Sequence, residues 1–341
     1  QQCRRGGYQV NYAPVMDVNN NPENPVINDR SFGEDKNRVT LLGLQYIKGM
    51  QELGVLTCAK HFPGHGDTDT DSHLALPVVR STRATLAAVE LPPFRAAIGA
   101  GIAGIMSAHI ALPAIEPDNT PATLAPSVMS GLLRDSLGFR GLAVTDAMTM
   151  QGVGKGYTIE QSSVLAMRAG ADILLMPSDT RRAIDAVTAA VERGELSRER
   201  IDQSVRRVLA MKVRTGAVAR PIVPLDSLRM IVGSSEHRAA AQRIAESGGV
   251  AAESCHRVCQ LQREGRREGP APRRPRDREE PQLWRPHVAD PAGARTVDRV
   301  DQDAHLLGGD RLQVEVALDK PLVARVRVVA LDEARRLGIG K

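Results

Sequence analysis

The chain has 341 residues and a formal net charge of +5, and its composition is 42% hydrophobic, 25% charged and 3% aromatic. These hydrophobic and charged fractions are typical of a globular protein, and so few aromatic residues argue against stacking platforms for nucleic acid. The sequence contains no run of about 18 apolar residues, the length that a membrane span needs, and no signal peptide is visible. Four cysteines in a chain of this length do not indicate a disulfide framework.

Short apolar runs alternate with amphipathic helical stretches from the start of the chain to about residue 214. The runs cover residues 8–17, 54–61, 101–109, 141–146 and 171–177. Their length and apolar character predict strands that are buried on both faces, as in a parallel sheet, with Cys58 as a buried residue. Between them, residues 35–53 and 197–214 have apolar residues at helical spacing. Ser127 is the predicted N-cap of a further helix that stops at Gly138.

The ends of these predicted strands carry polar residues that can do chemistry. They are Asp17, Lys60 with His61, His109 and Asp146. A TIM barrel builds its site from the ends of many strands, whereas a doubly wound sheet usually shows a glycine-rich phosphate loop, which this sequence lacks. The predicted fold class is therefore α/β, a TIM-like (β/α) barrel. Because five units are visible and Gln1 does not resemble a natural start, we expect two or three further units upstream, so that the barrel is N-terminally incomplete.

The composition changes after about residue 248. Residues 257–285 are crowded with arginine and proline and have neither the helical nor the strand period, which is typical of a disordered segment or linker. Residues 312–330 regain some alternation, which predicts one or two strands there.

The densest polar segment is KHFPGHGDTDTDSH, residues 60–73, which gathers three histidines, three aspartates and a lysine. Taken alone it allows three interpretations. One is a zinc or manganese site whose ligands come from His61, His65, Asp67, Asp71 and His73. Another is proton transfer by a histidine that an aspartate orients. The third is a solvated polar loop that turns at Pro63 and Gly64.

Two further segments can contribute to a site. GLAVTDAMTM, residues 141–150, puts Asp146 directly after an apolar strand, where a lone aspartate is also often a helix N-cap. NPENPVINDRSFGED, residues 21–35, is a loop stiffened by prolines, in which Arg30 is a candidate to clamp a polar substrate. Arg30 is alternatively a surface arginine that pairs with Glu34 or Asp35.

In their order and spacing, the three segments resemble the barrel domain of family 3 glycoside hydrolases. KHFPGHGDTDTDSH is similar to the pattern of the β-N-acetylhexosaminidase branch of that family. The resemblance is strong over residues 8–150 and extends to about residue 214. It implies a catalytic barrel over residues 1–214, and a linker with the first helix of a second α/β domain over 215–247, including a helix at 236–246. Residues 248–341 form an atypical tail whose arginine-rich run suits a frame-shifted reading of a GC-rich gene.

The resemblance also implies a mechanism. Asp146 is the nucleophile, His73 is the general acid and base, and Asp71 orients His73. The sugar-binding residues are Arg30, Lys60 and His61. No metal and no cofactor are required, and the implied partner is a carbohydrate rather than a nucleic acid or a membrane.

The implied reaction is retaining hydrolysis of terminal β-linked N-acetylglucosamine from peptidoglycan fragments or chitin oligomers. The alternatives are a β-glucosidase or β-xylosidase of the same family and a metal-dependent hydrolase that uses His61, His65 and His73. The upstream strands that supply another sugar-binding Asp and Arg in this family have no match in the sequence. Cellular location and oligomeric state stay open.

Overall fold

The computed structural model describes residues 1–219, 223, 225–247, 312–319 and 323–330. The chain divides into one compact unit over Gln1–Leu261 and another over Gln262–Lys341, and each is considered by itself. None of the helices in the described ranges combines the length and the apolar character needed to cross a bilayer.

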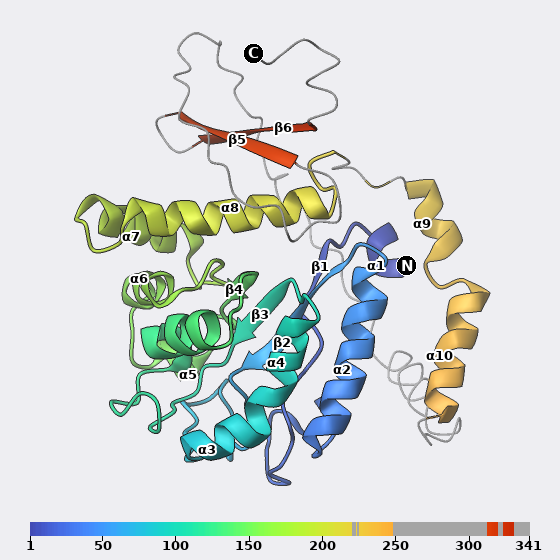
Figure 1. Cartoon of the computed structure of the whole chain (residues 1–341), viewed down its shortest axis with the longest axis horizontal. Coiled ribbons are helices and arrows are strands. Elements are labelled where there is room, and N and C mark those ends of the chain that lie inside the picture. The colour runs from blue at the N-terminus through green and yellow to red at the C-terminus, as the bar shows by residue number, and fades with distance from the viewer. Residues whose placement is uncertain (220–222, 224, 248–311, 320–322, 331–341) are drawn as a thin grey trace, which may run out of the picture. The chain divides into compact units, whose positions relative to one another are not determined.

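The first unit is built on a parallel sheet whose strands lie side by side in chain order (Figure 1). These strands are β1 (Val10–Asn11), β2 (Leu56–Phe62), β3 (Gly104–Ser107) and β4 (Leu142–Val144). Val144 forms a further parallel bridge to Ile173. The order of the strands does not reverse, as it does at the switch point of a doubly wound sheet. The described part of the sheet is therefore an arc of the predicted TIM-like α/β fold.

The strands are shorter than the predicted apolar runs, and two of the five runs form little or no strand. Residues 8–17 form only β1 and one bridge between Val15 and Lys60, because Pro14 has no amide hydrogen to donate to a ladder. Residues 171–177 form no strand beyond the bridge at Ile173. There the amide of Leu175 donates to the side-chain hydroxyl of Thr145 instead of a backbone carbonyl, so the ladder does not continue.

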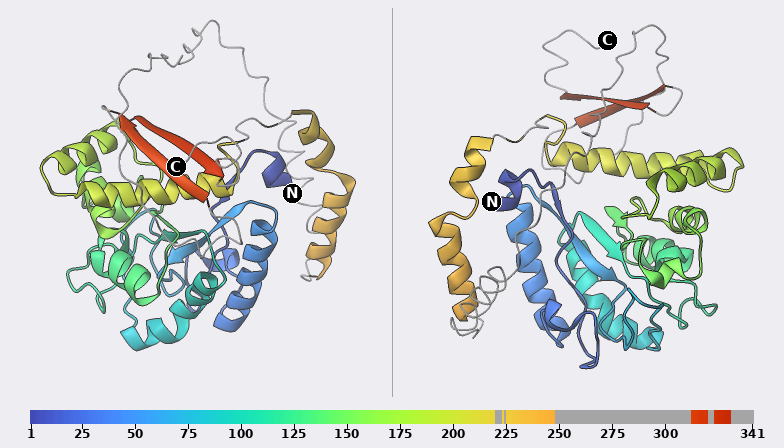
Figure 2. Two further views of the ribbon diagram at one scale, coloured as in Figure 1. Left: turned by 45° about the horizontal axis from the view of Figure 1, so that its top comes forward. Right: turned by 180° about the vertical axis from the view of Figure 1, so that it is seen from behind.

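The helices and turns cover the sheet in chain order. They are α1 (Gln2–Arg5), the 3₁₀ turn η1 (Asn28–Arg30), α2 (Lys36–Gln51), α3 (Arg83–Thr85), the π-helical turn η2 (Leu86–Glu90), α4 (Leu91–Gly99), the 3₁₀ turn η3 (Ala122–Leu124), the π-helix η4 (Ser127–Ser136), α5 (Gln151–Gly154), α6 (Ile159–Ala169), α7 (Thr180–Glu192) and α8 (Arg198–Arg214). Helices α2 and α4 lie side by side against one face of the sheet (Figures 1 and 2).

The starts of α2 and α8 each have a side-chain cap, whereas the one N-cap that the sequence predicted does not form. Asp35 accepts the Arg38 amide at the start of α2, and Ser197 accepts the Arg200 amide at the start of α8. Ser127 was predicted to be an N-cap, and this prediction is wrong. Ser127 is the first residue of η4, and its hydroxyl donates to the carboxylate of Glu116 instead of accepting a backbone amide at the helix start.

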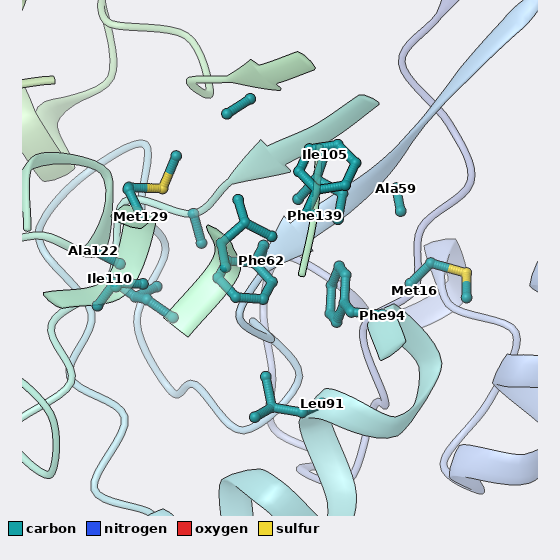
Figure 3. Packing of buried hydrophobic residues seen from close by; sticks show 14 of the residues in the cluster. Met16, Ala59, Phe62, Leu91, Phe94, Ile105, Ile110, Ala122, Met129 and Phe139 are labelled. Carbon is teal, nitrogen blue, oxygen red and sulfur yellow. The ribbon is translucent and has the colours of Figure 1, made fainter. Parts of the chain in front are cut away.

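Buried apolar residues fill the space between the sheet and its helices on one face. Phe62 of β2 and Phe94 of α4 meet edge to face with ring centroids 5.4 Å apart, and Ile105 of β3 packs beside them (Figure 3). On the opposite face, the buried residues Cys58, Met106, Leu142 and Val144 pack against side chains of α8. Burial raises the pKa of the Cys58 thiol, which agrees with its predicted role as a buried apolar residue.

Past α8, the structure describes α9 (Leu225–Ile231) and α10 (Ser235–Ser247), and α10 coincides with the helix predicted at 236–246. In the second unit, β5 (Leu312–Asp319) and β6 (Val323–Ala330) form an antiparallel hairpin, which confirms the strands predicted at 312–330. The arginine-rich segment 257–285 lies outside the described residues. The predicted division at residues 214 and 247 stays a prediction.

Candidate active site

Asp17, the last residue of the first predicted strand, is a fully buried acceptor at the carboxyl end of β2. Its carboxylate accepts the backbone amides of His61 and His65, and it lies 2.7 Å from the Nδ1 atom of the His61 ring. Burial alone would raise the pKa of Asp17, but the two histidines and these hydrogen bonds outweigh burial and lower it. A buried carboxylate with three donors therefore fixes the backbone and the ring of His61.

The His61 ring connects Asp17 to Asp146. Nδ1 of the ring donates to Asp17. The other ring nitrogen, Nε2, lies 3.9 Å from Asp146 Oδ2. The second oxygen of Asp146, Oδ1, accepts the amide of Ala147 at 2.8 Å. The His61 side chain is only 5% exposed, whereas Asp146 is 18% exposed. The cluster thus begins at a buried carboxylate and ends at one that solvent or a ligand can reach.

Lys60 and Arg30 add positive charge beside this cluster. Burial and the charge of Arg30 lower the pKa of Lys60, while Asp146 acts in the opposite direction. Arg30 is exposed at the end of η1, and its guanidinium donates to the carbonyl of Val26. Within residues 1–219 it makes no ion pair with Glu34 or Asp35, and Asp35 instead caps α2. Neither of the two expected ion pairs therefore occupies the exposed Arg30 side chain.

Asp71 and His73 form a pair on the outer part of the 60–73 loop. Asp71 Oδ1 accepts the His73 amide at 2.8 Å and lies 2.7 Å from Nδ1 of the His73 ring. Burial acts to raise the pKa of Asp71, but the hydrogen bonds from His73 outweigh it and lower the pKa. The His73 side chain is 59% exposed. The pair thus consists of a carboxylate that holds one imidazole nitrogen and leaves the other toward solvent.

The backbone of this pair rests on α5, which begins five residues after Asp146. The carbonyl of Ser72 accepts the Gly152 amide at 3.0 Å, and the carbonyl of His73 accepts the Gln151 amide at 3.4 Å. A side chain at position 152 would come 3.1 Å from the Ser72 carbonyl, so glycine permits this close approach. The structure joins the two loops in this way, but within residues 1–219 no hydrogen bond or ion pair links His73 to Asp146 directly.

Two buried titratable groups beneath the loop were not assigned to the site from the sequence. His109 lies at the end of β3, and its Nε2 is 3.1 Å from the carbonyl of Ala147, next to Asp146; burial lowers its pKa, although Asp146 opposes this. Glu90 lies under Gly64, where a side chain on that glycine would come 2.8 Å from the Glu90 carboxyl. The position of His109 after an apolar run was a usable signal, whereas Glu90 sits in an amphipathic helical stretch and offers none.

Glu90 is held almost without hydrogen bonds. Asn20 donates to Oε1 at 2.9 Å, and Oε2 has no partner among the described residues. Burial, together with the negative charges of Asp17 and Asp67, raises the pKa of Glu90 to about 8. The carboxyl group is therefore protonated at neutral pH and fills the space below the loop as a neutral group.

The three histidines of the 60–73 loop each bind different side chains, and their rings do not share a common ligand position. His65 has both ring nitrogens in contact with hydroxyls, Nδ1 with Thr68 and Nε2 with Ser72. His61 and His73 each hold an aspartate through Nδ1. Within the described residues, no three His, Cys, Asp or Glu side chains are arranged to hold a metal ion.

Three comparisons with known proteins bear on this geometry. The family model described as "Glycosyl hydrolase family 3 N terminal domain" matches residues 1–211. "Beta-hexosaminidase A" of Pseudoalteromonas piscicida is 37% identical over 252 residues, which are 68% of this chain and 42% of that relative. "Beta-N-acetylglucosaminidase/beta-glucosidase" of Cellulomonas fimi is 31% identical over 261 residues, which are 72% of this chain and 45% of that relative.

Among solved structures, a glycoside hydrolase family 3 beta-N-acetylglucosaminidase from Paenibacillus sp. str. FPU-7 aligns with a TM-score of 0.67 and 43% identity. The alignment covers 72% of this chain and 47% of that one. The chain therefore spans about half the length of the relatives it matches.

Proposed function

The chain belongs to glycosyl hydrolase family 3, and we propose that it is a retaining glycosidase that removes terminal, non-reducing β-linked N-acetylglucosamine. One observation carries this proposal: the backbone of the Asp71–His73 segment is hydrogen-bonded to the first residues of α5, the helix that follows Asp146. A displacement at an anomeric carbon needs a nucleophile on one side and a proton donor on the other. The hydrogen bonds between the His73 loop and the segment after Asp146 support Asp146 as the nucleophile and His73 as the proton donor.

Asp146 is the nucleophile in this proposal. One of its carboxylate oxygens attacks the anomeric carbon, and the bond from that carbon to the leaving oxygen breaks. Protonated His73 donates its Nε2 proton to the leaving oxygen, and the negative charge of Asp71 stabilises the imidazolium before transfer. In the second step a water molecule gives a proton to His73 and attacks the same carbon, which releases Asp146 as a carboxylate. Two inversions give net retention of configuration.

A histidine suits the acid and base roles for a physical reason. A carboxylic acid must have its pKa raised to stay protonated at neutral pH, whereas an imidazole changes charge near neutrality without burial. The exposure of the His73 side chain is compatible with this role. The lowered pKa of Asp71 keeps its negative charge available beside the ring.

Arg30, Lys60 and His61 are proposed to bind the hydroxyl groups or the N-acetyl group of the sugar. Lys60 and His61 stand beside Asp146, as their mutual electrostatic effects and the 3.9 Å approach indicate. Charged donors form stronger hydrogen bonds to sugar oxygens than neutral donors do. The proposed natural substrates are muropeptide or chitin fragments, and the residues need no metal or cofactor to perform the steps above.

The substrate proposal is tested with two aryl glycosides on the full chain. We expect p-nitrophenyl N-acetyl-β-glucosaminide to be hydrolysed with a far higher kcat/KM than p-nitrophenyl β-glucoside. Asp146→Asn in the same assay controls for contaminating glycosidases. Equal rates on the two glycosides would contradict the choice of N-acetylglucosamine.

A β-glucoside is the second candidate substrate, because the Cellulomonas fimi relative is named for both activities. A faster reaction with the glucoside would favour that candidate and leave the proposed roles of Asp146 and His73 intact.

A further inference from the structure

The 60–73 loop contains a buried hydrogen-bonded pair that the mechanism above does not use. His65 and Ser72 are each 1% exposed, although Ser72 stands between Asp71 and His73, whose side chains are 30% and 59% exposed. Nε2 of His65 lies 3.0 Å from the Ser72 hydroxyl. The buried residue of the Asp71–Ser72–His73 segment is therefore held from below by an imidazole.

The direction of this hydrogen bond follows from the protons available. The Thr68 hydroxyl donates to the carbonyl of His65 at 3.0 Å, so its oxygen is an acceptor for the His65 ring at 2.8 Å. Nδ1 of His65 therefore carries the ring proton. Burial lowers the pKa of His65 to about 4, which leaves the ring neutral at ordinary pH. Nε2 is then an acceptor, and it receives the hydroxyl proton of Ser72.

His65 is itself held rigidly. Its amide donates to Asp17 at 2.8 Å, and its carbonyl accepts the side-chain amide of Asn24 at 2.8 Å. The same amide of Asn24 also donates to the Gly66 carbonyl and to the Thr68 hydroxyl. These residues are buried, so the contacts are shielded from competing water.

We propose that His65, acting through Ser72, is a positioning residue that fixes where Asp71 and His73 stand relative to the bound glycoside. The inference rests on the proposed function, because it assigns a geometric role within the same proton-transfer machinery. On its other side the Asp71–Ser72–His73 segment is held by the Gln151 and Gly152 amides. The His65–Ser72 hydrogen bond is a side-chain contact that connects this segment to His65, whose amide is bound by Asp17. Asp17, His61 and Asp146 are called the Asp17 cluster below.

A kinetic readout separates positioning of the proton donor from general support of the fold. The value of kcat/KM reports the first step, in which the leaving oxygen departs. A 2,4-dinitrophenolate leaves without a proton, whereas a phenolate of ordinary basicity needs one. Misplacing His73 therefore slows the phenyl glycoside much more than the dinitrophenyl glycoside.

The experiment uses Ser72→Ala in the full chain with phenyl and 2,4-dinitrophenyl N-acetyl-β-glucosaminides. We expect kcat/KM to fall by roughly 10–100-fold for the phenyl glycoside and by less than about 3-fold for the dinitrophenyl glycoside. The quantity compared is the ratio of kcat/KM for the phenyl glycoside to kcat/KM for the dinitrophenyl glycoside. Both are measured on one preparation, so the folded fraction cancels. Ser162→Ala is the matched control, because it removes a buried hydroxyl of α6 that donates to the carbonyl of Thr158, and its ratio should equal that of the wild type.

Three outcomes are informative. A fall in the ratio for Ser72→Ala alone supports the inference. An equal fall with both glycosides, or no fall with either, overturns the positioning role while the proposed function stands. If the wild-type chain hydrolyses neither N-acetylglucosaminide, the proposed function fails and the inference fails with it.

Discussion

Asp17 and Asp172 are both buried aspartates beside the parallel sheet, and their partners differ in kind. Asp17, near the carboxyl end of β2, is bound by two backbone amides and an imidazole. Asp172, near the start of β4, is bound by the guanidinium groups of Arg134 at 2.7 Å and Arg207 at 2.9 Å. It also accepts the Ser204 hydroxyl and the Ala143 amide.

The arginine cluster around Asp172 is closed. Arg134 also donates to the carbonyls of Phe139 and Gly141, and burial lowers its pKa to about 10, although Asp172 opposes this. These bonds join η4, β4 and α8, and both carboxylate oxygens of Asp172 accept hydrogen bonds inside the protein. In the Asp17 cluster, by contrast, His61 has a second nitrogen that faces the partly exposed Asp146.

Asp17 and Asp172 meet the same physical requirement with different donors. A buried carboxylate needs donors wherever it lies. The arginines that bind Asp172 hold three elements of the fold together. The imidazole that binds Asp17 has a second nitrogen that faces another carboxylate, Asp146. We therefore expect changes at Asp172 to affect mainly stability and changes around Asp17 and Asp146 to affect mainly turnover.

The largest expected effect is the loss of turnover in Asp146→Ala. If Asp146 is the nucleophile, kcat should fall by roughly 10³-fold or more, because no other carboxylate takes its place at the anomeric carbon. Because Asp146 is partly exposed, the urea midpoint should change little. The measurement is steady-state kinetics with an aryl N-acetyl-β-glucosaminide, and an unchanged kcat would refute the assignment.

Asp172→Ala tests the other half of the comparison. Removing the carboxylate leaves the buried Arg134 and the partly buried Arg207 without their acceptor, so the free energy of unfolding should fall by about 3–5 kcal/mol. Urea denaturation followed by circular dichroism measures this change. At low temperature, kcat per folded molecule should stay close to the wild-type value. A stable variant with reduced kcat would break the proposed division between the two clusters.

Lys60→Met should have an intermediate effect. The substitution keeps the aliphatic stem and removes the charged donor, so kcat/KM should fall by roughly 10–150-fold, which corresponds to about 1.5–3 kcal/mol. Lys48→Met, an exposed lysine of α2 that pairs with Glu52, is the matched control. An unchanged kcat/KM in Lys60→Met would remove Lys60 from the substrate-binding set.

Glu90→Gln should change how stability depends on pH. The pKa of Glu90 is raised from 4.5 to about 8 in the folded chain, so between these values the folded state binds more protons than the unfolded state. The free energy of unfolding of the wild type therefore falls as pH rises, by at most about 1.4 kcal/mol per pH unit from this group. Relative to the wild type, Glu90→Gln should gain about 2 kcal/mol between about pH 5.5 and pH 7.5.

Urea titrations of both proteins at the two pH values measure this difference. Glu52→Gln, which changes an exposed glutamate, is the control for general effects of charge. A difference between wild type and Glu90→Gln that does not vary with pH would contradict the protonated carboxyl under Gly64.

The smallest expected effect is that of chelation. The ring nitrogens of His65 are both bonded to hydroxyls, and His61 and His73 hold separate aspartates. The loop therefore offers no converging set of ligands, and dialysis against EDTA should leave kcat unchanged. Loss of activity that added zinc restores would support the metal-dependent alternative.

The sequence predicted the parallel strands and the clustering of polar groups at their ends because both follow from local patterns. Apolar runs that end in polar residues are visible at Lys60, His61 and Asp146 without a structure. The role of Asp17 was not visible, because it depends on a hydrogen bond across 44 positions of the chain. The capping role of Ser127 was predicted wrongly because Glu116 competes for its hydroxyl. The protonated state of Glu90 depends on burial under a distant loop, which no local pattern encodes.

The central claim is that Asp146 forms a covalent bond to the sugar, and trapping that bond tests it most directly. The 5-fluoro derivative of N-acetyl-β-glucosaminyl fluoride has a good leaving group and a slowed second step, so the glycosyl-enzyme should accumulate. Mass spectrometry of the peptic digest then identifies the modified residue. We predict a single added sugar on Asp146, and no label in Asp146→Ala. A label on another residue, or turnover with an inverted product and no label, would contradict the account.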